Sequence, residues 1–223
     1  VPSGDPTTAA SEDVTGNTNK PEKAAEVTDT GSKQEDKAAL DSTKTKADTQ
    51  LDSVSSELKK VVDTLDNITD TVKAGAKSKV DTAISSAKEA ITKADSEEAV
   101  KKAVDAAADT AKKTVVDSIT EDITKQADKA KTAIDSIAGL SDKEKTAYKA
   151  EVDKAASKAV GKAAEAVARI AANAATGAGD SGKAAASSEA NVKLIEELNK
   201  EITADISDVK TEAKVKGVSN IYA

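Results

Sequence analysis

Few side chains in this chain are suited to catalysis. The chain has no His and no Cys, which removes the commonest general bases, thiol nucleophiles and transition-metal ligands. Two Ser-x-x-Lys pairs remain, Ser56 with Lys59 and Ser85 with Lys88. At this spacing a lysine can activate a serine nucleophile. In a chain so rich in Ser and Lys the spacing arises readily by chance. We therefore expect no catalytic residue, and we expect that the protein is not an enzyme.

Metal and phosphate chemistry have similarly weak signals. Asp63, Asp66 and Asp70 are spaced to lie on neighbouring helical turns, where carboxylate oxygens could hold Ca²⁺ or Mg²⁺. No Asp-x-Asp-x-Asp-Gly loop accompanies them, so a solvated helix face explains them better. The glycine-rich stretch "TGAGDSG", 176–182, follows no predicted strand, as a phosphate loop would, and indicates a plain loop. We predict no metal site and no cofactor.

Two tyrosines are the only aromatic residues. Tyr148 falls on an apolar stripe, which favours a place in the core. Tyr222 is at the exposed end of the chain, where an aromatic ring could anchor a protein partner. The sequence identifies no other binding residue.

The composition favours thin helices over a large core. Val, Leu and Ile total 38 of 223 residues, and Phe, Trp and Met are nearly or wholly absent as core formers. Alanine, the best helix former, dominates together with Lys and Glu. The net charge of −7 argues against nucleic acid as a partner, since phosphates require a basic surface. No run of 18 apolar residues is present, so we expect no membrane insertion.

The first 39 residues differ from the rest of the chain. They contain all three prolines, and they are rich in Thr, Ser, Asp and Glu. Such a segment buries too little apolar surface to offset its chain entropy, which predicts a disordered leader or stalk. From Leu40 onward there is no proline, which permits long helices.

Apolar residues at spacings of three and four predict a series of amphipathic helices after residue 40. The stripes are 51–68, 80–94, 100–137, 148–170 and 192–209, the last running from Val192 through Ile195 to Val209. Breaks are expected at Gly75, Gly139, 176–182 and Gly217. Capping boxes are expected at "DSEE", 95–98, and at "SDKE", 141–144.

The stripes repeat. "LDNI", 65–68, matches "IDSI", 134–137, at an offset of 69 residues, and "VDTAISSAKEA", 80–90, matches the segment from Val152 at an offset of 72. We place the three-residue difference in the loop between these helices. "SEEAVKKAV", 96–104, has a weaker partner in "SSEANVKLI", 187–195. The repeat predicts two copies of a three-helix unit, with one helix continuous between them.

We therefore expect an all-α protein with tandem three-helix bundles that form an elongated rod and a disordered N-terminal leader. The predicted parts are the leader, 1–39; a first three-helix module, 40–118; a second, 119–215; and a C-terminal tail, 216–223.

The stretch "AKTAIDSIAGLSDKEKTAYKAEVDKAASKA", 130–159, resembles a helical repeat of unknown function from Gram-positive cell-wall-anchored surface proteins. These include extracellular-matrix-binding proteins and accumulation-type adhesins. "VDTAISSAKEAITKADSEEAVKKAVDAA", 80–107, and "AKVKGVSNI", 213–221, are also similar to that repeat. The first copy has "ITDTVKAGAK" in place of the Leu-Ser-Asp-x-Glu turn, and the second has the glycine-rich insertion. The resemblance implies an exported, wall-attached helical protein, and it supplies no catalytic residues.

The function expected from this evidence is that of a non-catalytic spacer or adhesin module on a bacterial surface, extracellular and either wall-attached or secreted. A protein partner is expected: a host matrix or serum protein, or a second copy. One alternative is a three-helix module that captures a host protein such as an immunoglobulin or a complement regulator. Another is a disordered protectant against stress or desiccation. An exposed apolar or aromatic patch on one helix face would favour host-protein capture.

Overall fold

The computed structural model describes the backbone of residues 23–223 and the side chains from residue 36 onward. The described residues are almost all helical and contain no strand, which confirms the all-α prediction. Residues 1–22 of the expected leader lie outside the described residues, and the first helix begins at Lys23. No helix among the described residues is long and apolar enough to cross a membrane.

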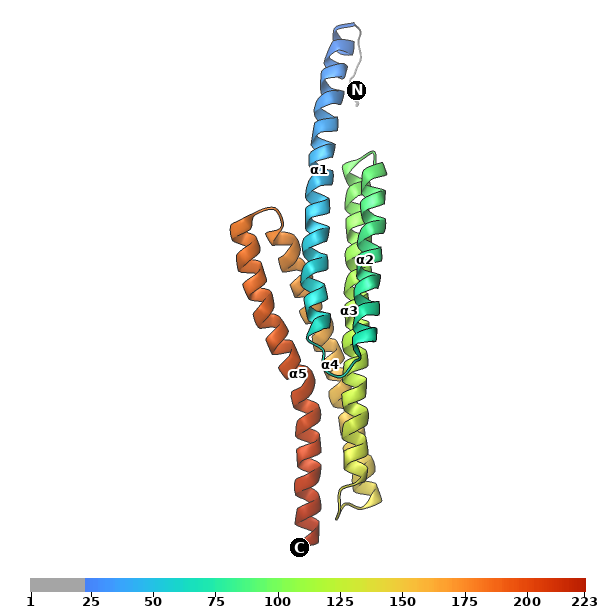
Figure 1. The fold of residues 1–223 in the computed structure, drawn as a ribbon, viewed down its shortest axis with the longest axis vertical. Helices are drawn as coiled ribbons and strands as arrows, with labels where there is room; N and C mark the ends of the chain where they lie inside the picture. The colour runs from blue at the N-terminus through green and yellow to red at the C-terminus, as the bar shows by residue number, and fades with distance from the viewer. Residues whose placement is uncertain (1–22) are drawn as a thin grey trace. The chain divides into compact units, whose positions relative to one another are not determined.

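Five helices follow one another along the described chain (Figure 1). Their bounds are α1 Lys23–Asp63, α2 Asp70–Lys93, α3 Glu97–Asp135, α4 Asp142–Gly177 and α5 Ser181–Ile221. The predicted continuous helix is α3, which runs for 39 residues without a break. Because 39 residues rise about 60 Å at 1.5 Å per residue, α3 is long enough to take part in two successive helical units.

The described chain divides into two compact units. In the smaller, the residues before Lys46 in α1 are grouped with the α2–α3 turn, Asp95–Glu97. There the hydroxyl of Thr43 donates a 2.7 Å hydrogen bond to Glu97 Oε1. The larger unit comprises residues 46–94 and 98–223. It holds nearly all of the core and all of the sites discussed below.

Polar side chains begin three of the helices as N-caps. Ser141 forms the predicted capping box: its hydroxyl accepts from Glu144 N at 3.1 Å, and the Glu144 carboxylate accepts from Ser141 N at 3.0 Å. Thr69 caps α2 and Asp180 caps α5 in the same way. Each cap satisfies a backbone N–H that the first turn of a helix leaves without an intrahelical partner.

Several predicted breaks are placed differently by the structure. Gly75 lies inside α2 and Gly217 lies inside α5, which continues to Ile221 where we expected a tail. The glycine-rich stretch 176–182 is mostly helical, because α4 ends at Gly177 and α5 begins at Ser181. At the second expected capping box, α3 begins at Glu97, so the residue before the helix is Ser96 and not Asp95.

The core of the larger unit is a set of aliphatic and alanine side chains on the facing sides of all five helices. Its fully buried large members are Leu51, Leu58, Leu65, Ile91, Ile119, Ile123, Ile134, Ile170, Leu198, Val61 and Val62. Alanines fill the positions where helices approach closely, especially along α3 and α4. Because full burial of an aliphatic side chain contributes about 1.5–3 kcal/mol, this aliphatic set and not the alanines supplies most of the hydrophobic stabilisation.

The end of the first apolar stripe is not helical. Helix α1 ends at Asp63, yet Leu65 and Ile68 are buried in the loop that follows. Their spacing from Val61 fits a helix, but the loop turns them into the core from an irregular backbone. The expected helix 51–68 is therefore five residues too long.

Repeated helical contacts and a candidate interaction surface

Two hairpins, α1–α2 and α3–α4, are held by ion pairs that recur at a fixed spacing. Each of the two lysine–aspartate pairs in the first hairpin has a counterpart 72 residues later in the second. The pairs are Lys59–Asp81 at 2.8 Å with Lys131–Asp153 at 2.9 Å, and Lys77–Asp63 at 2.6 Å with Lys149–Asp135 at 2.8 Å. Exposed pairs like these contribute little stability individually, so their value here is that they fix which residues are equivalent.

The same spacing continues through the loops. Asp135 ends α3 72 residues after Asp63 ends α1, and the N-caps Thr69 and Ser141 are also 72 residues apart. The expected offset of 69, with a three-residue difference in this loop, is therefore wrong. "LDNI" is equivalent to "IAGL", 137–140, and Thr69-Asp70 begins α2 where Ser141-Asp142 begins α4.

The third helix of each set contacts the loop of its own hairpin. In the first set the buried Asp122 carboxylate accepts from Asn67 N at 2.8 Å and from Asn67 Nδ2 at 3.2 Å, and Lys129 Nζ donates to Asn67 Oδ1 at 3.3 Å. In the second set Asn220 Nδ2 donates to the carbonyl oxygen of Gly139 at 2.9 Å. Gly139 is 72 residues after Asn67, and Asn220 is 91 residues after Lys129.

The offset of 91 between the third helices also describes their buried faces. Buried positions of α3 match buried positions of α5 at this offset. The matched pairs are Val100 with Asn191, Ala107 with Leu198, Ala111 with Ile202, Val115 with Ile206 and Asp122 with Ala213. The weak sequence match between 96–104 and 187–195 has this same offset. The longer third-helix offset arises because α4 has 36 residues and α2 has 24.

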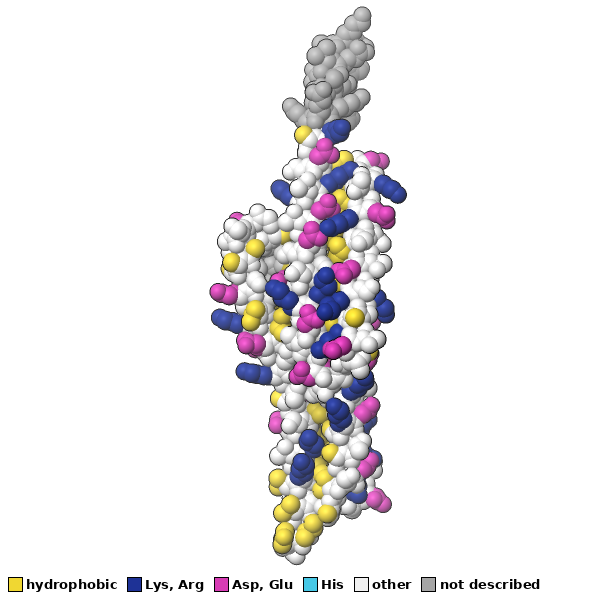
Figure 2. Space-filling view, viewed as in Figure 1, with side chains coloured by type: hydrophobic (Ala, Val, Ile, Leu, Met, Phe, Trp, Pro, Cys, Tyr) yellow, Lys and Arg dark blue, Asp and Glu magenta, His cyan; other side chains and the backbone are white. Residues whose placement is uncertain are grey.

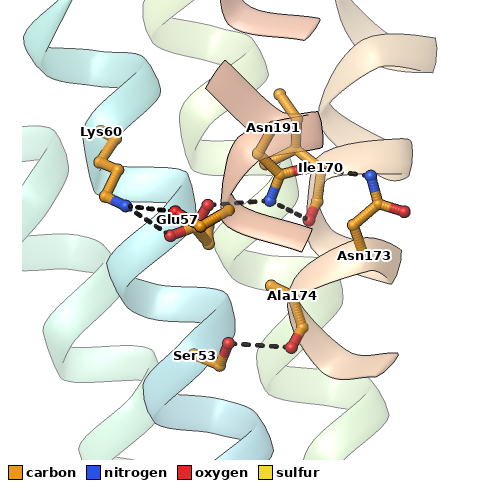
Figure 3. A network of polar contacts seen from close by, with 8 residues as sticks. Ser53, Glu57, Lys60, Ile170, Asn173, Ala174 and Asn191 are labelled. Carbon is orange, nitrogen blue, oxygen red and sulfur yellow. Dashed lines mark hydrogen bonds and ion pairs between the residues drawn. The ribbon is translucent and has the colours of Figure 1, made fainter. Parts of the chain in front are cut away.

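A buried polar cluster joins α1 to the α4–α5 hairpin (Figure 3). Asn191 of α5 has no exposed surface, and its Nδ2 donates to Glu57 Oε1 of α1 at 2.9 Å and to the carbonyl oxygen of Ile170 in α4 at 3.3 Å. Its Oδ1 accepts from Asn173 Nδ2 at 3.0 Å. Lys60 Nζ lies 2.6 Å from the other oxygen of the Glu57 carboxylate.

This cluster fixes the register between helices from both hairpins. One turn before Glu57, the hydroxyl of Ser53 donates to the carbonyl oxygen of Ala174 at 2.8 Å (Figure 3). Sliding α1 along α4 would break this bond and would leave Asn191 and Glu57 buried without partners, which is costly. Sequence analysis missed Asn191 because it interrupts the apolar stripe of α5. The predicted stripe residue Val192 is instead half-exposed, at 50%.

The side chains singled out for chemistry are placed apart from one another. Lys59 and Lys88 of the Ser-x-x-Lys pairs bind Asp81 and Asp52, at 2.8 Å and 2.6 Å, and do not bind the serines. Asp63 is paired with Lys77. Among residues 36–223 no group of three or more metal-ligating side chains gathers in a geometry that could hold a metal ion.

Charged side chains line the open groove between α3 and α4. Lys131 and Asp153 pair with each other across it, as do Lys149 and Asp135. The groove therefore offers paired charges and no converging set of unpaired donors or acceptors. Nothing in its lining indicates a small-molecule site.

Tyr148 is half-buried on α4 and does not lie in the core as predicted. Removal of its ring from water raises the pKa of the phenol, and the neighbouring carboxylates of Glu212, Glu151 and Glu144 raise it further. A phenol with a raised pKa stays neutral, so Tyr148 acts as an amphipathic packing residue between α4 and α5.

Glu144 gives the contact between the α3–α4 loop and α5 a pH dependence. The hydrogen bond from the backbone N–H of Ser141 lowers the pKa of Glu144, and the Asn220 amide and the charge of Lys216 lower it further. The stability that this group contributes is therefore present above its unfolded pKa near 4.5 and is lost as the pH falls through the folded value. We expect Glu144→Gln to be less stable than the parent at pH 6, with the difference shrinking below about pH 4.5.

Urea denaturation at pH 6, 4.5 and 3.5 measures this difference. The matched control is Glu189→Gln, which changes an exposed carboxylate on the same protein. A stability difference for Glu144→Gln that stays constant over this range would show that the charge of Glu144 does not stabilise the loop.

Exposed apolar side chains gather at the end of α5. Val215, Val218, Ile221 and Tyr222 are 64%, 56%, 53% and 85% exposed, and together they form what we name the α5 end face. Figure 2 shows hydrophobic side chains gathered at this end of the helix. Val215, Val218 and Tyr222 are spaced by three and four residues, so they share one side of the helix, with Ile221 beside them. Tyr222 is exposed, as the sequence predicted.

Comparisons of the chain with protein-family models, with curated proteins and with solved structures gave no match in any of the three.

Proposed function

We propose that this chain is a non-catalytic helical module of a bacterial surface protein, which acts as a spacer and adhesin built from two copies of a three-helix unit. The observation that carries the proposal is the recurrence of the same contacts at offsets of 72 and 91 residues. Duplicated helical units that share one continuous helix are typical of arrays whose role is to extend and to present a surface. The copies are α1–α2–α3 and the end of α3 with α4 and α5.

The exterior of the larger unit suits a spacer. Its ion pairs are lysine–aspartate and lysine–glutamate contacts on exposed helix faces, which keep the surface hydrated while contributing little energy each. The apolar residues are committed to one continuous core. Attachment would then come from many weak contacts, one set on each of many copies, so that avidity exceeds the affinity of any single unit.

Beads coated with the full chain at graded densities test this proposal. We expect bead aggregation, or adhesion to immobilised extracellular-matrix proteins, to rise steeply with density, while the free chain binds weakly. Beads carrying an unrelated helical protein of similar length and charge are the matched control. If the chain supports neither aggregation nor adhesion at any density above this control, the adhesin part of the proposal fails.

A second candidate function is the capture of one host protein, such as an immunoglobulin or a complement regulator. The α5 end face favours it, because aromatic and aliphatic side chains exposed together are typical of interaction sites. In that case Val218→Asp and Tyr222→Ser would each abolish the capture of serum proteins by the coated beads. Val192→Asp, at an exposed valine of the same helix outside this face, would leave capture unchanged.

The proposed location is extracellular, either attached to the cell wall or secreted. It is supported by the resemblance of residues 130–159 to repeats of wall-anchored proteins. Immunogold labelling of intact cells against permeabilised cells tests it. Labelling of intact cells is expected.

A further inference from the structure

The last two turns of α5 are apolar on two sides. One side, with Ala213 and Gly217, is buried against the α3–α4 loop, where Gly217 lies beside Ala138 and Ile137. The other side is the α5 end face, and it is open to solvent among the described residues. A helix with apolar residues on both sides is built to pack on both sides. The question is what packs on the second.

The internal repeat gives the equivalent place in the first copy. Ninety-one residues before Val218 and Ile221 are Ala127 and Ala130 of α3, and both are buried, at 4% exposure each. At this point α3 changes role: Asp122 and Lys129 contact the loop of the first hairpin, and Lys131 pairs with Asp153 of α4 in the second. Ala127 and Ala130 thus lie where a third helix becomes the first helix of the following unit.

The first helix of the first copy has the same register. Seventy-two residues before Ala127 and Ala130 are Ser55 and Leu58 of α1, which are 6% and 0% exposed. In both complete examples of a first helix these two positions are buried by the hairpin that the helix begins. Val218 and Ile221 occupy these positions a third time, and only there are they exposed.

We propose that the α5 end face is the docking face for a further helical unit of the same kind, whose second helix lies on Val218 and Ile221 as α4 lies on Ala127 and Ala130. This proposal rests on the proposed function, because it takes the repeat as the design of the protein. It also sets a limit to the contact. Lys210 and Lys214 occupy the positions of Ile119 and Ile123, so the docked helix covers the last two turns of α5 and leaves the preceding turns in water.

A fusion chain tests this docking directly. Residue 222 is equivalent to residue 131, so residues 1–222 followed by residues 132–223 extend α5 in register and append one more hairpin. A second fusion carries two extra alanines at the junction, which rotate the appended helix by about 200° and move its apolar face away. A third keeps the register and carries Val218→Asp with Ile221→Asp. The full parent chain with this double substitution is the folding control.

Amide hydrogen exchange of the appended hairpin is the readout. We expect protection in the in-register fusion to exceed that in either other fusion at least tenfold, while the double substitution leaves protection in the parent chain unchanged. Equal protection in the three fusions, or no protection in any, overturns the docking proposal. So does a loss of protection in the substituted parent, because the face would then serve the existing unit. If the parent without substitutions is itself unprotected, the proposed function fails as well, which separates the two failures.

Discussion

Asn191→Asp should be the most destabilising of the small changes in the polar cluster. The introduced carboxylate would lie, fully buried, within hydrogen-bonding distance of the Glu57 carboxylate and the carbonyl oxygen of Ile170, where the amide now donates to both. Two acceptors would then face a third without a proton between them. We expect a loss of about 3–5 kcal/mol in the free energy of unfolding at pH 7, which is typical of an uncompensated buried charge.

The effect of Asn191→Asp should depend on pH in a defined direction. Burial and the nearby Glu57 carboxylate raise the folded-state pKa of the introduced carboxyl above its unfolded value near 3.9. The deficit is therefore complete at a pH above the folded value and shrinks as the pH falls toward the unfolded value. Urea denaturation of the variant and the parent at pH 7, 5.5 and 4.5 measures this trend.

Asn191→Leu is the matched control, because it removes the same hydrogen bonds at similar volume without adding charge. We expect it to cost about 1–3 kcal/mol with little dependence on pH, since Glu57 keeps its ion pair with Lys60. Equal and small effects of both variants would mean that Asn191 is reached by water, and the buried cluster would not then fix the register of α1.

Gly217→Val should be the second large effect, because α5 touches the α3–α4 loop through backbone at this position. A Cβ atom on Gly217 would lie 2.6 Å from the carbonyl oxygen of Ala138 and 2.6 Å from the Ile137 side chain. On the other side of the contact, Gly139 has a φ of +90°, and a Cβ there would lie 2.3 Å from the carbonyl oxygen of Gly217. Neither backbone can move without separating α5 from the loop.

We expect Gly217→Val to destabilise the protein by about 3 kcal/mol or more, and Gly139→Ala by about 2 kcal/mol or more, since overpacking and left-handed backbone strain each cost 1–3 kcal/mol. The controls are Gly75→Ala and Gly161→Ala, at helix-interior glycines with no atom within 4 Å of the added Cβ. These should stabilise the protein by about 0.5–1 kcal/mol. Thermal melts of all four variants give the comparison. Destabilisation by the control substitutions equal to that at Gly217 would contradict a specific close contact.

The sequence was sufficient for the parts of the fold that depend on local periodicity. The stripe from Val100 to Ile134 predicted one long helix, and α3 is continuous through it. The Ser141 capping box was predicted from four residues, because its bonds lie within one turn. The second-helix offset of 72 was also visible, since Val80 and Val152 begin similar strings.

The parts that depend on distant contacts were not visible in the sequence. Leu65 and Ile68 continue the helical spacing of α1, and only the packing of the loop shows that the helix has already ended. Gly217 was taken as a helix end, because nothing local reveals that its missing side chain admits the α3–α4 loop. Asn191 was missed for the same reason: its partners, Glu57 and Ile170, lie 134 and 21 residues away.

Hydrogen exchange of the full chain, followed by mass spectrometry in plain buffer, tests the central claim that the repeated helical units form one stable folded body. The account predicts slow exchange with similar protection in the peptides around Leu58 and around Ala130, and in those around Val80 and around Val152, because these pairs occupy equivalent buried positions. Exchange at the rate of an unfolded chain throughout residues 46–223 would contradict the account and would favour the disordered protectant.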